Sequence, residues 1–330
     1  MKNKSIVVIG GGTGTFSVLS GLKKYTNDIT AIVSMADSGG SAKKEKDEWG
    51  LLPSSDIRKS LIALADISTQ DSLILRKLFQ YRFAKGKGIR GMTFGNIFLI
   101  ALTNILGSQS QAIDKASELL RIRGSVLPVT LNNVELVAEY EDGSRVVGEH
   151  AIDEPEHNGK IRLTRLYTTP QAHITQRAKE AIKSSDAIII GPGGFYTTIM
   201  ANIVVEGVSE AINKSKAKKI FILNLMTEYG QTFGFSAYTF IEEIGKYIDI
   251  HNINYVLVNN SPIPERILER YKKYHTAPVV NDLTGKYPFQ VIPADLLSKR
   301  AAPKQKGDNL RRSFIRHNPE KLALICQKLL

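Results

Sequence analysis

The sequence predicts an α/β fold with a mostly parallel sheet, and three observations indicate it. Short apolar runs rich in β-branched residues, such as SIVVI at residues 5–9 and DITAIVSMAD at 28–37, lead into polar or glycine-rich loops. An apolar pattern at helical spacing, TFSVLSGLKKY, separates these two runs. The same alternation resumes after residue 170. Buried strands that alternate with amphipathic helices are typical of β-α-β units and of a parallel sheet covered on both faces.

The other elements follow in order along the chain. Residues 38–48, SGGSAKKEKDE, are predicted to form a polar loop. Apolar periodicity predicts helices at 56–66, 71–82, 95–106, 111–121, 171–184, 197–213 and 236–249. Later strands are predicted at AIIIGPGG, KIFILNLM and INYVLVNN.

A different pattern occupies residues 125–170. Apolar and polar residues alternate there with period two around the Asp142-Gly143 turn, which predicts a small antiparallel β insertion. No linker of low complexity interrupts the chain. We therefore expect one α/β domain over residues 1–330, with the insertion inside it.

The composition, with 42% hydrophobic residues, is that of a globular protein. No apolar run reaches the roughly 20 residues that a membrane helix needs. The amino terminus leads directly into a strand-like run without a secretory signal, so we expect a cytoplasmic location. Cys326, the single cysteine, lies in an apolar pattern and is interpreted as a buried helix residue.

The net charge of +12 is concentrated in two segments, 83–91 and 299–316. No nucleic-acid-binding module accompanies these basic residues. We interpret them as basic surface around a site for an anionic ligand, with nucleic-acid contact as the alternative.

The first strand ends in a glycine-rich loop that contains Gly10, Gly11, Gly12, Thr13 and Gly14. Ligands of open parallel sheets bind beyond the carboxyl ends of the strands, where such loops lead into helices. Backbone N–H groups and the dipole of the following helix suit a phosphate. The third glycine of a dinucleotide-binding fingerprint is replaced by a threonine, so tight strand-to-helix packing is the alternative.

A second glycine-rich loop, GPGGFYTT, places Gly191, Gly193 and Gly194 before Tyr196 at the start of a helix. Two such loops in one sheet indicate a shared anion site more strongly than one does. Asn224 and Thr227 follow a third strand, where amide and hydroxyl groups can bind sugar hydroxyls or the edge of a base.

Four further side chains are candidates. Asp37, followed by Ser38, ends the second strand, where a carboxylate can contact a ribose or hold a divalent cation beside a diphosphate; capping of a turn is the alternative. Asp56 and Asn96 are further candidates for the site. The alternative for Asp56 is an N-cap of the following helix, and the alternative for Asn96 is a buried amide that pairs with backbone groups. The six histidines show no paired spacing, so neither a histidine metal site nor a Ser-His-Asp triad is supported.

These segments, with LLPSSDIRKSLIALAD, TFGNIFLIAL and the terminal RHNPEKLALI, resemble the CofD-like superfamily over nearly the whole chain. Within it they resemble the YvcK-type gluconeogenesis factors. The resemblance implies a Rossmann-like three-layer α/β/α fold and a cleft for a diphosphate nucleotide. YvcK-type proteins bind UDP-sugars such as UDP-N-acetylglucosamine and regulate cell shape, wall synthesis and growth on gluconeogenic carbon. Their CofD relatives are transferases that move a 2-phospho-L-lactyl group from a guanosine diphosphate donor to the deazaflavin Fo, with Mg²⁺.

The resemblance also implies roles for individual residues. Gly12, Thr13 and Gly14 would hold phosphate, and Asp37 and Asp56 would form a catalytic, metal-binding floor. The ligand would be lined by Asn96, Gly193, Tyr196, Asn224 and Thr227.

Two residues depart from the family pattern. Ser38 stands where the family usually has a second carboxylate, and Met92 stands where it usually has a histidine. Loss of a carboxylate weakens a Mg²⁺ site but leaves backbone phosphate sites intact. The leading hypothesis is therefore a regulator that binds a nucleotide-sugar, with homodimerisation as a further expectation. A CofD-like transferase and an NAD-dependent oxidoreductase are the second and third hypotheses.

Overall fold

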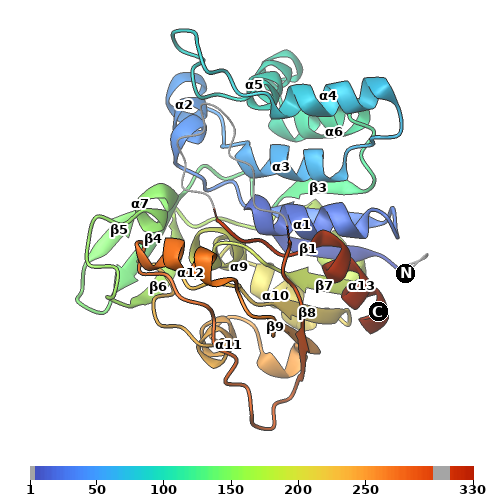
Figure 1. Cartoon of the computed structure of the whole chain (residues 1–330). Coiled ribbons are helices and arrows are strands. Elements are labelled where there is room, and N and C mark those ends of the chain that lie inside the picture. The colour runs from blue at the N-terminus through green and yellow to red at the C-terminus, as the bar shows by residue number, and fades with distance from the viewer. Residues whose placement is uncertain (1–3, 300–312) are drawn as a thin grey trace.

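The computed structural model describes residues 4–299 and 313–330, and in this part of the chain a seven-stranded sheet forms the centre of the molecule (Figure 1). Its order is β10-β9-β8-β7-β1-β2-β3, and every neighbouring pair is parallel. The strands are β1 (Ile6–Gly10), β2 (Ile29–Val33), β3 (Ser125–Pro128), β7 (Ala187–Ile190), β8 (Lys218–Ile222), β9 (Tyr255–Asn259) and β10 (Gln290–Ala294). The predicted α/β class with a mostly parallel sheet is confirmed.

The strand order reverses between β1 and β7. From β1 the chain moves outward through β2 and β3, then returns to β7 on the other side of β1 and continues to β10. At such a switch point the connections leave in opposite directions, so a crevice opens beyond the carboxyl ends of the two strands.

Helices cover both faces of this sheet, because alternate residues of each strand point to opposite sides. Ile6 and Val8 of β1 pack in one core with α1 (Gly12–Leu22), α3 (Ser55–Leu64) and α13 (Pro319–Leu329). Val7 and Ile9 pack in the other core with α8 (Gln176–Ser184), α10 (Val208–Lys214) and α11 (Ala237–Gly245). This is the three-layer arrangement that the resemblance implied. Further helices are α4 (Gln70–Gln80), α5 (Phe94–Leu106), α6 (Gln109–Leu119) and α12 (Glu265–Lys272).

One loop prediction and two helix predictions are wrong in kind or in extent. The segment predicted as a loop forms α2 (Gly40–Trp49), which buries a carboxylate, Glu45, beside the small Ala42. The helix predicted from 171 begins at Gln176, because Thr175 caps it by accepting a hydrogen bond from Ala178 N. The helix predicted over 197–213 is divided into η1 (Phe195–Met200), α9 (Ala201–Ile203) and α10, and Gly207 before α10 has a φ of 89°.

The antiparallel part is a three-stranded sheet of β4 (Glu135–Tyr140), β5 (Arg145–Val147) and β6 (Leu163–Thr169), with the short helix α7 (Glu149–Asp153) after β5. It begins later than the predicted residue 125, because Ser125–Pro128 pairs with β2 in the main sheet. In Figure 1 the small sheet lies beside the carboxyl ends of the main strands, and α7 faces α2. The insertion therefore contributes a helix to the edge where a ligand is expected.

The predictions for Cys326 and for the basic C-terminal stretch can be compared with the described residues. Cys326 is fully buried in α13, as predicted. Of the basic stretch 299–316, residues 300–312 lie outside the described residues. None of the helices that the structure describes combines the length and the apolar character needed to cross a membrane.

Candidate functional site

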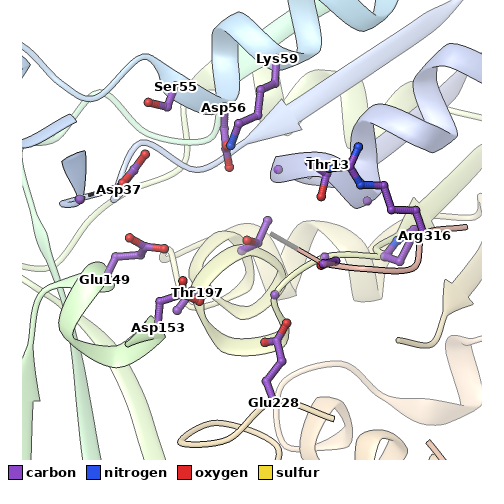
Figure 2. Close-up of a pocket in the computed structure, with 18 of the residues that line it drawn as sticks. Thr13, Asp37, Ser55, Asp56, Lys59, Glu149, Asp153, Thr197, Glu228 and Arg316 are labelled. Carbon is purple, nitrogen blue, oxygen red and sulfur yellow. Dashed lines mark hydrogen bonds and ion pairs between the residues drawn. The ribbon is translucent and has the colours of Figure 1, made fainter. Parts of the chain in front are cut away.

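A cleft of about 520 Å³ opens beyond the carboxyl ends of β1, β2 and β7 (Figure 2). Both glycine-rich loops contribute to its lining: residues 12–14 of the first glycine loop (residues 10–14) and 193–194 of the second glycine loop (residues 191–194). Charged side chains from α2, α3, α7 and the C-terminal segment (residues 313–318) complete it. The cleft is the crevice that the switch point of the sheet predicts.

The two glycine loops contact each other. A Cβ atom on Gly14 would lie 2.2 Å from the carbonyl oxygen of Pro192, and one on Gly11 would lie 2.1 Å from Oδ2 of Asp56. At these two positions the protein itself occupies the space that a side chain would need. At Gly11 and Gly14 the structure therefore favours the alternative interpretation, tight packing of the backbone.

Gly12 behaves differently from its neighbours. Its φ is 64°, in the left-handed region, and no heavy atom lies within 4 Å of the place a Cβ would take. Gly12 also begins α1, so the unpaired N–H groups of the first helical turn, those of Gly12, Thr13 and Gly14, are available at the cleft. This is the arrangement that binds phosphate at a helix N-terminus.

Two asparagine side chains hold the glycine loops by donating hydrogen bonds to backbone carbonyl groups. Asn202 of α9 is fully buried, and its Nδ2 donates to the Gly10 carbonyl at 3.2 Å and to the Thr198 carbonyl at 2.7 Å. Asn224, beyond β8, lines the cleft and donates from Nδ2 to the Gly193 carbonyl at 2.9 Å. Sequence reasoning selected Asn224 but missed Asn202, which lies inside an apolar helical pattern.

Four carboxylates gather at the β2 side of the cleft: Asp37, Asp56, Glu149 and Asp153, here called the acid cluster (Figure 2). Burial, followed by the nearby charge of Asp56, raises the pKa of Asp37. Burial and then the charge of Asp37 raise the pKa of Glu149 well above its ordinary value. Both shifts have the sign expected where negative charge is concentrated away from water.

Only part of this charge is offset inside the protein. Lys59 Nζ lies 2.7 Å from Asp56 Oδ1, and Gln231 Nε2 donates to Asp153 Oδ1 at 3.0 Å. Glu149 and Asp153 were missed by sequence reasoning. They come from α7 in the insertion, and no motif in the sequence connects that helix to the loop after β2.

The acid cluster provides carboxylates of the kind that bind Mg²⁺. Among the described residues, no three His, Cys, Asp or Glu side chains are grouped so that they could hold a metal ion. Mg²⁺ usually binds through one or two carboxylates together with water and the phosphates of a substrate. Asp37 and Asp56 therefore fit an ion that is held jointly with a bound diphosphate.

One cationic side chain, Arg316, lies on the other side of the cleft. Arg316 lies in the C-terminal segment, and Figure 2 shows its side chain directed toward Thr13 of the first glycine loop. The hydroxyl of Tyr271 fixes this segment by accepting hydrogen bonds from Phe314 N at 2.8 Å and Ile315 N at 3.3 Å. The Arg316 guanidinium is thus held near the start of α1, where it adds positive charge for an anion.

The next residue, His317, has a structural role. Burial lowers its pKa to about 4, so the imidazole is neutral at neutral pH. Its Nε2 lies 3.2 Å from the carbonyl oxygen of Leu223 and donates to it. This bond anchors the C-terminal segment to the end of β8.

Three predicted ligand contacts are corrected by the structure. Asn96 is fully buried: its Oδ1 accepts from Arg58 Nε at 2.7 Å, and its Nδ2 donates to Glu45 Oε1 at 2.5 Å. The buried Tyr196 hydroxyl donates to Glu243 Oε2 at 3.0 Å. The buried Thr227 hydroxyl donates to the Ala277 carbonyl at 3.2 Å. Each side chain turns inward to a polar partner instead of lining the cleft.

The other predicted residues fall into two groups, those that line the cleft and those that only lie in the segments around it. Ser38 Oγ accepts a hydrogen bond from His150 N at 2.9 Å and so joins the loop after β2 to α7. Gly10, Gly11 and Gly191 belong to the two loops but do not line the cleft. The predicted residues that do line it are Gly12, Thr13, Gly14, Asp37, Asp56, Gly193, Gly194 and Asn224.

Comparison with known proteins gives the family. Residues 6–297 match the sequence profile of the family described as 2-phospho-L-lactate transferase CofD. The chain belongs to the CofD family. Within the CofD family, it is 39% identical over 279 residues to the gluconeogenesis factor of Bacillus subtilis (strain 168), covering 84% of this chain and 86% of that protein. It is 38% identical over 283 residues to the gluconeogenesis factor of Halalkalibacterium halodurans, covering 86% and 85% of the two chains.

A solved structure agrees with the CofD-family fold. The crystal structure of a member of the UPF0052 family from Bacillus halodurans superposes with a TM-score of 0.87 at 33% sequence identity, covering 99% of each chain. The resemblance to the CofD-like superfamily and its YvcK-type gluconeogenesis factors, inferred from the sequence, is confirmed.

Proposed function

We propose that the protein binds a diphosphate nucleotide-sugar of the UDP-N-acetylglucosamine kind, and that it acts as a YvcK-type regulator of cell shape, wall synthesis and carbon metabolism. One observation carries the binding proposal. The loops that follow the two strands of the switch point face the same cleft and meet where Gly14 contacts Pro192. A diphosphate presents two anionic groups, which match two adjacent backbone loops.

The surroundings of the loops support this ligand. The start of α1 offers backbone N–H groups to one phosphate, and the second glycine loop borders the same space through Gly193 and Gly194. Arg316 adds a guanidinium, which pairs well with phosphate oxygens. On the other side, the carboxylates of Asp37 and Glu149 can accept hydrogen bonds from sugar hydroxyls.

A second candidate function is a CofD-like transferase, favoured by the position of Asp37 and Asp56 beside the first glycine loop. The donor would be a guanosine diphosphate that carries a 2-phospho-L-lactyl group, and the acceptor would be the deazaflavin Fo. Mg²⁺ held by these two carboxylates would supply charge stabilisation for the leaving phosphate. Unchanged transfer by an Asp37→Asn variant would contradict the role of Asp37.

A thermal-shift experiment separates the candidates. The protein is melted with UDP-N-acetylglucosamine, UDP-glucose, GDP, GTP or NAD, each with and without Mg²⁺. A ligand at one hundred times its Kd stabilises the folded state by about 2.7 kcal/mol, which is a measurable shift in Tm. A response to UDP-sugars without Mg²⁺ is expected for the regulator, and a Mg²⁺-dependent response to guanine nucleotides for the transferase. No response to any UDP-sugar at millimolar concentration would contradict the proposal.

A matched pair of variants locates the bound ligand. Gly12 and Gly107 have φ angles of 64° and 67°, and at both positions a Cβ would meet no atom within 4 Å. Alanine at either position should therefore cost similar stability, about 1 kcal/mol. Only Gly12 faces the cleft, so only Gly12→Ala should reduce the thermal shift that the UDP-sugar produces. Equal shifts in the two variants would place the ligand elsewhere.

A further inference from the structure

The neighbouring helices α4 and α5 expose large apolar side chains to water. Ile74 and Leu78 of α4 are 47% and 43% exposed, and Ile105 of α5 is 77% exposed. Both helices lie within the described residues, and none of their residues lines the cleft. Single exposed apolar residues are common, but a group of them on neighbouring helices indicates a contact surface.

α4 and α5 form one layer because they pack against each other. The ring centroid of Phe79 in α4 lies 6.1 Å from that of Phe94 and 5.0 Å from that of Phe98, both in α5. Figure 1 shows this layer at the top of the molecule, beyond α3 as seen from the main sheet. The 13 residues of α5 include no charged residue, although a surface helix normally carries charges on its outer face. Depletion of charge is typical of the centre of a protein–protein interface.

The charges of α4 are arranged symmetrically about Ile74. Asp71 lies three residues before Ile74, and Lys77 lies three residues after it. Residues three apart are neighbours on a helix surface, so each charge flanks the exposed Ile74. Both charged side chains are exposed, and in the part of the chain that the structure describes neither of them forms an ion pair or a hydrogen bond.

This arrangement is complementary to a second copy of itself. If two copies of α4 lie antiparallel with their Ile74 side chains opposite each other, Asp71 of each copy lies level with Lys77 of the other. A two-fold symmetric interface requires a patch that fits its own copy in this way. A different partner protein would not require opposite charges at equal distances from the apolar centre.

We propose that α4 and α5 form the interface of a symmetric homodimer, with Ile74 next to the two-fold axis and Asp71 facing Lys77 of the other copy. Dimerisation removes the exposed apolar side chains of both helices from water. The two pairs of opposite charge fix the antiparallel direction, because parallel helices would place like charges side by side.

Sedimentation velocity over a range of protein concentrations tests the position of the interface. Ile74→Glu places a carboxylate at the centre of the proposed contact, on both copies. We expect it to weaken dimerisation at least about a hundredfold. The control is Leu324→Glu in α13, because Leu324 is 46% exposed and also lies on a helix. It should dimerise as the wild-type protein does, and a melting curve for each variant verifies that it is folded.

Charge reversal tests the symmetry. Asp71→Lys and Lys77→Asp each place like charges opposite each other twice, so each variant alone should dimerise about tenfold more weakly at low salt. When the two variants are mixed, lysines of one face aspartates of the other. The mixture should therefore form heterodimers with the affinity of the wild-type dimer, measured by fluorescence transfer between labelled copies. Acid at the start of a helix and base at its end also suit the helix dipole, but that effect gives no pairing between the two variants.

Three results would overturn the proposal. A wild-type protein that remains monomeric at high micromolar concentration would show that this surface does not bind a second copy. Equal dimerisation of the wild-type protein and Ile74→Glu would place the interface on another surface. Failure of the two charge variants to pair, although each is folded, would contradict the antiparallel arrangement of α4.

Discussion

The two ends of the candidate site differ in chemistry although the same parallel sheet supports both. Beyond β2, the acid cluster combines carboxylates from the main domain with Glu149 and Asp153 of the insertion. Beyond β8 and β9, a second cavity is lined by apolar side chains such as Val258 and Leu268 together with Asn259 and Asn260. The glycine loops of β1 and β7 lie between these two ends. The sheet therefore positions the two glycine loops that are proposed to bind phosphate, and the segments added around it line the space on either side.

The junction between the two glycine loops is the feature that both ends depend on, so Gly14→Val should have the largest effect. A Cβ at this position would lie 2.2 Å from the Pro192 carbonyl oxygen, and this backbone atom cannot move without displacing the second loop. We expect a loss of about 3 kcal/mol or more in the free energy of unfolding, measured by urea denaturation.

Gly285→Val is the matched control for this change. Gly285 is exposed, and the nearest atom to its Cβ position is the Tyr287 hydroxyl at 3.4 Å. Its substitution should change the free energy of unfolding by less than about 1 kcal/mol. Equal losses in the two variants would show that the loops are not in tight contact in solution.

The buried Glu45 of α2 should make the stability of the protein depend on pH. Burial raises its pKa from 4.5 to about 7, and hydrogen bonds from Ser54 and Asn96 offset only part of this shift. Between these pH values the folded protein keeps a proton that the unfolded chain has lost. Stability therefore falls as the pH rises through this window.

Glu45→Gln should remove this pH dependence. We expect the fall in the free energy of unfolding between pH 4.5 and pH 8 to be smaller than in the wild-type protein by up to about 3 kcal/mol. Glu48→Gln, at an exposed position of the same helix, is the control and should leave the fall unchanged. The measurement is a series of urea titrations across this pH range, and identical slopes for all three proteins would contradict a buried, charge-sensitive Glu45.

Much of the fold could be predicted because its strands are continuous apolar runs separated by helical periodicity. The exception was α2, whose buried Glu45 breaks that periodicity. The glycine loops could be located for a similar reason: glycine is needed where backbones meet, as at Gly14, or where φ is positive, as at Gly12. Strand ends thus indicated the loops that are proposed to hold phosphate.

The polar side chains around the loops were harder to predict. Asn96 and Tyr196 lie at the starts of helices, but their inward partners, Glu45 and Glu243, come from segments far away in the sequence. Glu149 enters the site only because the small sheet docks beside the main one. Tertiary contacts of this kind leave no local pattern, so the sequence could place the site but could not say which polar residues face it.

The proposed contact between the sugar and the acid cluster can be tested with Asp37→Asn. Removing one carboxylate reduces repulsion of a diphosphate, so UDP should bind a few-fold more tightly. If the sugar lies at this end, the variant should also lose a hydrogen-bond acceptor, and the preference for UDP-N-acetylglucosamine over UDP should fall about fivefold. Calorimetric titration with both ligands gives this ratio.

Asp142→Asn is the control for this experiment, because Asp142 lies at an exposed turn of the insertion and does not line the cleft. It removes the same charge from the protein but should leave both affinities unchanged. A constant preference for the sugar ligand in Asp37→Asn would show that Asp37 does not contact the sugar.

The smallest expected effect concerns Lys59, whose Nζ pairs with Asp56 inside the acid cluster at 2.7 Å. Lys115 and Glu118 form an i,i+3 pair of similar length, 2.6 Å, but their side chains are 52% and 66% exposed, compared with 25% and 15% for Lys59 and Asp56. Exposed pairs contribute little, whereas loss of Lys59 leaves another carboxylate unpaired among like charges. Lys59→Gln should therefore cost about 1 kcal/mol more than Lys115→Gln in urea denaturation at low salt. The difference should shrink in 1 M NaCl, and equal costs at low salt would mean that water reaches Asp56 well enough to replace its cation.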